Sequence, residues 1–256
     1  DTEAIPAKSK TIDFSQLTDF PLKVHIIPSM GNFALKRAEL IQLGNLPVIE
    51  IQPGPLSAWY NQLVKRITDL FLSALVIVTV LSWLSLILFM IDLFGERKGI
   101  FFRQKRTSLH GHPFTCIKYR SMKINDDADE KMARKGDERV TKMGRFLRRT
   151  SIDELPQFFN VFVGQMSVVG PRPHMLKHTD AYRKKIKNFM IRHTIKPGIT
   201  GQAQVNGYRG EIKQPADLEG RLREDVKYME NWTLWLDVKI MLLTLWVLLK
   251  GQKQAY

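Results

Sequence analysis

The chain has 256 residues, 44% of them apolar and 25% charged, which is enough to bury a real core and excludes an intrinsically disordered protein. A single cysteine, Cys116, excludes an internal disulfide and a four-cysteine zinc site. Lys and Arg number 39 against 25 Asp and Glu, a net charge of +14, so we expect a polyanionic partner: nucleic acid, a phosphorylated substrate or an anionic membrane surface.

The first part of the chain contains two strand-like runs. Residues 1–20 are polar and predict a loose arm, whereas residues 24–28 and 47–51 are short apolar runs bounded by turn residues, as is typical of buried strands. Pro53-Gly54-Pro55 predicts a domain boundary. We therefore expect residues 1–52 to be the end of a larger α/β domain or a small packed module, followed by a linker over residues 53–64.

The segment from Leu70 to Ile91 contains no charged residue. A helix that crosses a membrane needs roughly 20 apolar residues, so this run predicts a membrane-embedded helix within residues 65–95. The alternative is a fully buried core helix, which few domains of this size could surround.

Both flanks of the apolar run are basic, with Lys65 and Arg66 before it and Arg97 and Lys98 after it. Because cytoplasmic flanks carry excess Lys and Arg, both ends can lie on one face of the membrane. A helix that returns to the same face must bend, and the hydroxyl of Ser82 can bend it by bonding to a helix carbonyl. No proline is present to force a bend, so the residues alone leave crossing and returning open.

The basic stretch of residues 96–149 is typical of exposed faces or of charges that meet anionic lipid. Residues 101–104 and 114–119 alternate in polarity and predict a β-hairpin around Gly111-His112-Pro113. Residues 126–138 are densely charged and predict an exposed loop or helix.

Phosphate-handling residue types gather next around Asp153 and Glu154. Ser151 followed by Glu154 matches a capping box, which predicts a helix that begins at Ser151 or slightly later. The helix dipole and the nearby Arg148 and Arg149 would keep both carboxylates ionised. An ionised Asp beside a phosphate site is a possible nucleophile and a Glu can hold a divalent cation; the alternative is plain helix capping.

Two further segments carry weaker signals. Arg172 lies between Pro171 and Pro173, a stiff loop that suits bidentate phosphate binding, although it can equally be a surface turn. Residues 196–207 are rich in turn and amide residues and suit the lining of a polar pocket. The six histidines show no metal-ligand spacing, and we expect each to be structural.

The C-terminal stretch, residues 231–249, is strongly apolar and contains Trp232, Trp235 and Trp246, which suit a membrane interface. Asp237 and Lys239 argue against a deeply inserted span. We expect a helix that lies in the interface, with an ordinary core helix as the alternative.

Taken together, these segments resemble one family, the bacterial polyprenyl-phosphate sugar-1-phosphate transferases, also called monotopic phosphoglycosyl transferases. The resemblance covers about Lys65 to the C-terminus. It rests on seven ordered motifs: Lys65-Arg66, Phe101-Phe102-Arg103-Gln104, Lys118-Tyr119-Arg120-Ser121-Met122, Leu147 to Gln157, Gly170 to Pro173, Lys196 to Gly201, and Trp235-Leu236-Asp237.

The resemblance implies an enzyme that transfers a sugar-1-phosphate from a UDP-sugar to a polyprenyl phosphate with Mg²⁺. Its Asp-Glu pair falls on Asp153, the nucleophile that would form an aspartyl-phosphosugar intermediate with release of UMP, and on Glu154, the Mg²⁺ ligand. Arg148 and Arg172 match arginines that handle phosphate. Lys118, and with a weaker match Asp237, correspond to positions near the same site.

The resemblance also implies a fold and a location. The fold would be α+β and mainly helical, with a re-entrant membrane helix and a catalytic domain over residues 96–256 that carries a small β-hairpin and interfacial amphipathic helices. The active site would face the cytoplasm at the bacterial inner membrane, where the enzyme would start the synthesis of a surface polysaccharide such as a capsule or exopolysaccharide. This family usually bends its helix at a Ser-Pro pair, whereas here Trp83 follows Ser82, so the bend needs another cause.

The resemblance further implies that residues 1–52 are the end of a nucleotide-fold-like α/β module of a longer protein. Expected partners are a UDP-sugar, polyprenyl phosphate and an anionic membrane, and a homodimer is compatible with this interpretation. Two other functions compete with it. A membrane-tethered nucleic-acid binder would need a recognition helix or interleaved aromatic residues, which are not evident, so no nucleic-acid partner is expected. An inactive membrane scaffold of the same fold would recruit glycosyltransferases without turnover.

Overall fold

The computed structural model describes residues 38–43, 46–51, 54–94, 99–124, 136–186, 188–210, 212 and 214–250. The arm predicted for residues 1–20, the strand predicted at residues 24–28 and most of the segment at 126–138 lie outside these residues. The chain divides into two compact units, Asp1–Gln52 and Pro53–Tyr256. In the first unit, β1 (Ala38–Leu43) and β2 (Leu46–Ile51) pair as an antiparallel hairpin, so the strand predicted at residues 47–51 is confirmed.

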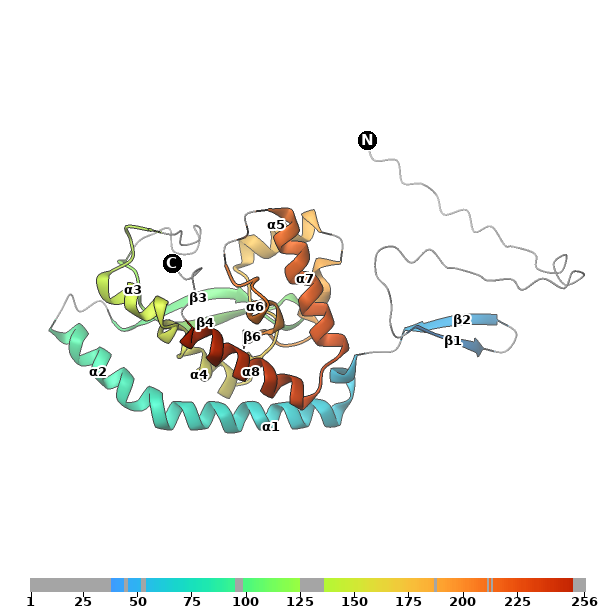
Figure 1. Ribbon diagram of the computed structural model, residues 1–256, viewed down its shortest axis with the longest axis horizontal. Helices are drawn as coiled ribbons and strands as arrows, with labels where there is room; N and C mark the ends of the chain where they lie inside the picture. Colours follow the sequence, from blue (N-terminus) through green and yellow to red (C-terminus); the bar gives the residue numbers. More distant parts are fainter. Residues whose placement is uncertain are drawn as a thin grey trace, which may run out of the picture. The chain divides into compact units, whose positions relative to one another are not determined.

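The second unit is mainly helical, with short strands, which confirms the predicted α+β class (Figure 1). After a short 3-10 turn, η2 (Pro55–Ser57), its long helix runs as α1 (Trp59–Val76), η3 (Ile77–Leu81) and α2 (Ser82–Leu93). The long helix therefore begins at Trp59. The linker expected over residues 53–64 is wrong for its second half, which is helical. Trp59–Leu93 spans 35 residues and is apolar enough to cross a membrane, and only 6% of its most apolar window is buried. That exposure argues against a fully buried core helix.

The long helix changes direction between α1 and α2, and η3 explains the bend (Figure 1). η3 is a π-helical turn, in which the Ser82 N–H donates to the Ile77 carbonyl oxygen five residues back. Such an insertion kinks a helix without proline. The Trp83 indole N–H donates to the Thr79 carbonyl at 2.6 Å, and the Ser82 hydroxyl bonds to the Val78 carbonyl at 2.6 Å. These two side chains therefore donate hydrogen bonds to backbone carbonyls at the bend.

The predicted hairpin is confirmed. β3 (Phe101–Thr107) pairs with β4 (Pro113–Tyr119) in antiparallel register, with Phe101 opposite Tyr119, around the short turn η4 (Leu109–Gly111). The Ser85 and Tyr119 hydroxyls lie 2.6 Å apart, so the hairpin is joined to α2.

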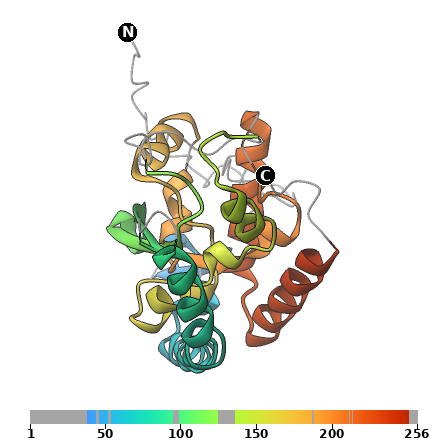
Figure 2. The ribbon, with the colours of Figure 1, turned by 90° about the vertical axis from the view of Figure 1, so that its left-hand side faces the viewer.

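The remaining elements complete the unit around the hairpin and the long helix (Figures 1 and 2). They are α3 (Lys142–Arg149), η6 (Ile152–Glu154), α4 (Gln157–Phe162), β5 (Ser167–Val169), α5 (Leu176–Lys185), η7 (Phe189–His193), β6 (Gly198–Thr200), α6 (Gln202–Val205), α7 (Pro215–Glu230) and α8 (Leu234–Leu249). β5 and β6 pair in parallel. The glycines at positions 170, 198 and 201 permit the close approach of the two backbones at this pairing, because a Cβ on Gly198 or Gly201 would collide with the Gly170 backbone.

Apolar packing forms two clusters on either side of α4. The larger includes Cys116, Val161, Met166 and Ile240, which join the hairpin, α4 and α8. In the smaller, the second half of the long helix packs on the hairpin and α3 through Leu81, Leu88, Tyr119 and Leu147. Phe158 of α4 contacts both clusters, so the turn that precedes α4 is held from two sides.

The C-terminal helix α8 confirms the predicted helix and corrects one residue. Trp235 and Trp246 are exposed, as expected of an interfacial helix, but Trp232 is only 4% exposed. Its indole N–H donates to Asp237 at 3.1 Å, so Trp232 belongs to the core and not to the interface. A buried indole needs such a partner, which Asp237 supplies.

Candidate active site

The Asp153-Glu154 pair lies in a 3-10 turn between two helices, not in the first turn of a helix capped by Ser151. Ser151 has φ 58°, a left-handed conformation, and makes no capping hydrogen bond from its side chain. Its N–H donates to the Arg148 carbonyl at 3.1 Å, so Ser151 ends α3 and does not begin α4. The predicted capping box is therefore wrong. The reversal at Ser151 instead turns Asp153 and Glu154 into the interior.

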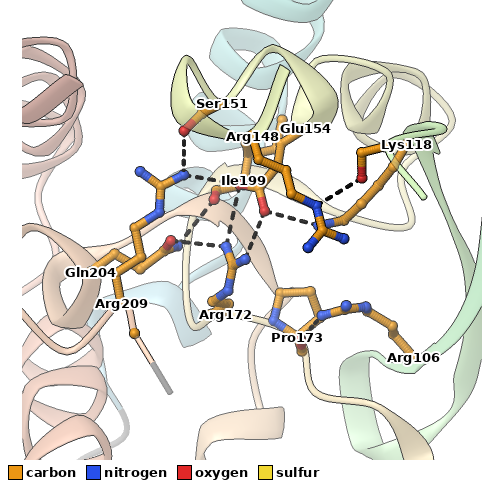
Figure 3. Close-up of polar contacts among 12 residues, drawn as sticks. Arg106, Lys118, Arg148, Ser151, Glu154, Arg172, Pro173, Ile199, Gln204 and Arg209 are labelled. Carbon is orange, nitrogen blue, oxygen red and sulfur yellow. Dashed lines mark hydrogen bonds and ion pairs between the residues drawn. The ribbon is translucent and has the colours of Figure 1, made fainter. Parts of the chain in front are cut away.

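Three basic side chains converge on Glu154 (Figure 3). Lys118 Nζ lies 2.9 Å from Oε1. Arg172 donates from Nη2 to Oε1 at 2.7 Å and from Nη1 to Oε2 at 3.3 Å. Arg209 Nη2 lies 3.3 Å from Oε2 and also donates to the Ser151 hydroxyl at 2.9 Å. Glu154 therefore occupies the centre of a cationic cluster drawn from three separate segments.

Lys118 reaches the cluster because α4 is fastened to β4. The Asn160 side chain accepts from the Ile117 N–H at 3.0 Å and donates to the Thr115 carbonyl at 2.7 Å. These two bonds fix the end of α4 against the strand that carries Lys118. The Asn160 side chain thus helps to set the spacing between Lys118 and Glu154.

The loop that carries Arg172 is held by two arginines, the buried Arg192 and the half-buried Arg106. Arg192 donates to the Arg172 carbonyl at 2.9 Å and pairs with Asp225 at 2.8 Å, with both side chains almost fully buried. Arg106 donates to the Pro173 carbonyl at 2.7 Å. The stiff loop predicted from the flanking prolines is therefore supported by tertiary contacts as well, and its Arg172 fork meets a carboxylate.

The two carboxylates have opposite electrostatic environments. Burial raises the pKa of Asp153 above its usual range, although Lys118 partly offsets this. Burial would also raise the pKa of Glu154, but Arg172, Lys118 and Arg209 outweigh it and hold that pKa well below the usual range. The expected stabilisation of the charged form therefore holds for Glu154. For Asp153, burial outweighs the nearby cations and disfavours the charged form, and its ionisation stays a prediction.

The structure brings together five of the predicted site residues and places the sixth elsewhere. Arg148 donates to the Ser121 hydroxyl at 2.8 Å and its charge acts on Asp153, so Arg148 borders the site. Asp237 instead accepts from Lys65 at 2.7 Å and from the Tyr228 hydroxyl at 2.7 Å. Asp237 therefore joins α8 to α1 and α7 rather than contacting Glu154.

Sequence reasoning missed Arg209 and the specific role of Gln204. Gln204 accepts from Arg172 at 3.0 Å and donates to the Ile199 carbonyl at 3.0 Å, in agreement with the polar lining predicted for residues 196–207. Arg209 lies just beyond that segment, among turn residues, and only its contact with Glu154 marks it.

The fit of Mg²⁺ can be judged from the donor groups. Within the described ranges, no three His, Cys, Asp or Glu side chains gather as a metal site. Mg²⁺ is commonly held by one or two carboxylates together with substrate phosphates, so Asp153 and Glu154 fit such an ion when a diphosphate completes its ligands. Both Glu154 oxygens already accept from cations, so Glu154 must give up at least one ion pair to bind it.

Comparison with known proteins identifies the family. The model of the family described as bacterial sugar transferase matches residues 60–251. The chain therefore belongs to the bacterial sugar transferase family, and the resemblance seen in its motifs is confirmed at the level of the family.

Three relatives illustrate the similarity. The UDP-glucose:undecaprenyl-phosphate glucose-1-phosphate transferase of Klebsiella pneumoniae is 42% identical over 246 residues, which cover 94% of this chain and 52% of the relative. The protein of the same name from Escherichia coli (strain K12) is 41% identical over 94% of this chain and 52% of the relative. That of Caulobacter vibrioides is 41% identical over 77% of this chain and 74% of the relative. The chain thus spans about half the length of the first two.

Proposed function

We propose that this chain transfers a sugar-1-phosphate from a UDP-sugar to a polyprenyl phosphate, such as undecaprenyl phosphate, and releases UMP. The observation that carries the proposal is the cluster at Glu154, where Lys118, Arg172 and Arg209 surround a buried Asp-Glu pair. Convergent cations of this kind suit the phosphates of a donor and an acceptor. The names of the relatives point to the same reaction.

Asp153 is the proposed nucleophile. Its carboxylate oxygen would attack the phosphorus that bears the sugar, the bond from that phosphorus to the bridging oxygen would break, and UMP would leave with the electron pair. An oxygen of the polyprenyl phosphate would then attack the same phosphorus, forming a new diphosphate and restoring the Asp153 carboxylate. Lys118, Arg148 and Arg172 would neutralise the charge on the donor phosphates. A raised pKa makes the ionised Asp153 carboxylate a more basic nucleophile.

Mg²⁺ is the proposed cofactor, with Glu154 as a ligand beside the substrate diphosphate. When bound, the ion would supply positive charge to the phosphate oxygens of the donor. Lys118, Arg172 and Arg209 position the Glu154 carboxylate, and the contacts that remain after one ion pair is given up would orient it toward the ion.

The long helix is the proposed membrane anchor in the bacterial inner membrane. Its bend at η3 and the basic residues that follow the apolar run, Arg97 and Lys98, favour a re-entrant path with the active site on the cytoplasmic face. Synthesis of a surface polysaccharide is the proposed setting. A homodimer stays a prediction.

The decisive experiment separates covalent transfer from an inactive scaffold. Detergent-solubilised protein is given UDP-glucose and Mg²⁺ without acceptor, with UDP-galactose and UDP-N-acetylgalactosamine in parallel because other relatives are named for these sugars. We expect up to one UMP per active site and a mass increase of one sugar-phosphate on Asp153. Asp153→Asn should abolish both. UMP release only with acceptor present, and without an adduct, would favour direct transfer, and no UMP in either case would favour the scaffold.

A further inference from the structure

A cavity of about 350 Å³ lies between the long helix and α8. Glu154 is among the residues that line it, so one end of the cavity reaches the proposed active site. Its volume is at the lower end of the range for ligand pockets in proteins. The apolar walls are formed on one side by Leu72, Val76 and Val80 and on the other by Met241, Leu245 and Leu248.

The two helices diverge to make this space. They are joined where Lys65 of α1 meets Asp237 of α8 at 2.7 Å. Beyond this ion pair the helices separate, and α8 lies apart from α1 when the molecule is viewed along the long helix (Figure 2). The wall residues all follow the ion pair along each helix, so the cavity occupies the opening between them.

The inner end of the cavity is polar and includes two charged side chains, Glu154 and Arg209. Ser151, Glu154, Gln204 and Arg209 line this end. Among the three basic side chains that contact Glu154, Arg209 lines the cavity, whereas Lys118 and Arg172 approach Glu154 from outside its lining. Of these three cations, Arg209 is therefore the one that faces the cavity.

The outer faces of the same two helices are apolar and exposed. Val78 of η3 is 71% exposed and Leu249 of α8 is 85% exposed, although both belong to strongly apolar helices. In a membrane these faces would contact hydrocarbon, so the cavity between them is placed to receive a lipid chain from the bilayer.

We propose that this cavity holds the isoprene units nearest the phosphate of the polyprenyl phosphate acceptor, and that Arg209 binds the acceptor phosphate. The assignment rests on the proposed function. An apolar channel that ends at a guanidinium complements a lipid with an anionic head, and it places the acceptor phosphate beside Glu154 and the adjacent Asp153. Lys118, Arg148 and Arg172 then serve the donor, so the two substrates approach the Asp-Glu turn from different sides.

The cavity promotes the reaction mainly by orienting the acceptor and only slightly by increasing the affinity for it. A lipid chain that moves from bilayer to cavity exchanges one apolar environment for another, so little hydrophobic free energy is gained. Its gain is orientation, because a phosphate held at a fixed place reacts much faster than one that diffuses. Filling the cavity should therefore block the acceptor step and leave the donor step intact.

The test uses paired substitutions of the same chemistry. Val80→Phe and Leu248→Phe introduce bulk into the cavity from opposite walls, while Val78→Phe and Leu249→Phe place the same ring on exposed faces of the same helices. Two steps are measured for each variant: UMP release without acceptor, and transfer to undecaprenyl phosphate. We expect kcat/KM for undecaprenyl phosphate to fall about tenfold or more in the two cavity variants, because each added ring occupies space that the isoprene units need. UMP release without acceptor should match wild type in all four variants.

Three results would overturn the proposal. Transfer by both cavity variants at the level of their controls would show that the acceptor does not use the cavity. Loss of UMP release along with transfer in both cavity variants would assign the cavity to the fold or the donor. If the cavity variants kept the wild-type KM for the acceptor but lost a bound phospholipid in native mass spectrometry, the occupant of the cavity would be a bulk membrane lipid. Failure of the proposed function is distinct, because wild-type protein would then transfer nothing.

Discussion

Arg172 and Glu154 form a two-point ion pair, with Nη2 to Oε1 at 2.7 Å and Nη1 to Oε2 at 3.3 Å. A guanidinium fork binds a phosphate in the same geometry as a carboxylate. Glu154 therefore occupies the place at Arg172 that a substrate phosphate would take. Substrate binding would then exchange this ion pair for a phosphate contact and release a Glu154 oxygen.

Arg172→Lys tests the need for the fork. The substitution keeps the charge but loses the planar donor pair, so we expect transition-state stabilisation to fall by about 1.5–3 kcal/mol, roughly a tenfold to hundredfold loss in UMP release. Arg183→Lys, on the exposed face of α5, is the matched control and should retain activity. Near-wild-type turnover of Arg172→Lys would remove the bidentate role.

Asp237 should matter for folding more than for chemistry. Asp237→Leu leaves Lys65 buried without its carboxylate, which typically destabilises a protein by about 3–5 kcal/mol. Thermal unfolding in detergent measures the loss. The double variant Lys65→Met with Asp237→Leu should recover much of the stability, because both charges are then removed. If Asp237→Leu instead kept its unfolding temperature and lost UMP release, Asp237 would belong to the active site.

Trp83 should stabilise the bend of the long helix. Trp83→Phe keeps an aromatic ring but removes the donor to the Thr79 carbonyl, so we expect a loss of about 0.5–1.5 kcal/mol from the missing hydrogen bond. Thermal unfolding in nanodiscs measures it, with Trp235→Phe on α8 as a second exposed tryptophan. Equal changes in the two variants would mean that the indole bond does not support the bend.

The re-entrant path predicts that both ends of the long helix face the cytoplasm. In a Cys116→Ser background, cysteines introduced at the exposed positions Ser57 and Lys105 should both resist a membrane-impermeant thiol reagent in intact cells. Both should react after the cells are opened, which shows that they are accessible. Labelling of one position from outside would demonstrate a crossing helix.

Stability should fall as the pH drops from about 6.5 to about 4. Burial and the charge of Arg192 lower the pKa of His193 from 6.5 to about 4, and His174 is shifted in the same direction. In this interval the unfolded chain binds protons that the folded chain does not, so acidification favours unfolding. Unfolding temperatures across the interval measure the effect. His193→Asn should flatten the profile, and His112→Asn, at an exposed position, should leave it unchanged.

Local patterns predicted the elements that depend on local chemistry. The uncharged run at Leu70 to Ile91 became a helix, and the alternation at residues 101–104 and 114–119 became the β3–β4 hairpin. Ser151 shows where such reasoning fails. Its spacing from Glu154 matches a capping box, but the preceding helix α3 ends at Arg149 and places Ser151 in a left-handed reversal. The pattern does not reveal which of two adjacent helices a residue terminates.

The basic residues before the apolar run show a second limit. The pattern predicts that Lys65 and Arg66 face the cytoplasm, although both lie within α1. Lys65 pairs with Asp237, and Arg66 donates to the carbonyls of Val161 and Phe162 at 2.6 Å and 2.8 Å. Both therefore hold elements of the catalytic unit against the helix, and their contribution to membrane orientation is reduced.

The sequence by itself determined the apolar helix, the hairpin, the Asp153-Glu154 pair and the motifs that mark the family, because helix and strand periodicity and short motifs depend on neighbouring residues. Only the tertiary structure decided which side chains share a site. Lys65 meets Asp237 across 172 residues, and Arg209 meets Glu154 across 55. Burial, which separates the pKa values of two adjacent carboxylates, and the cavity between two diverging helices likewise arise only when distant segments pack together.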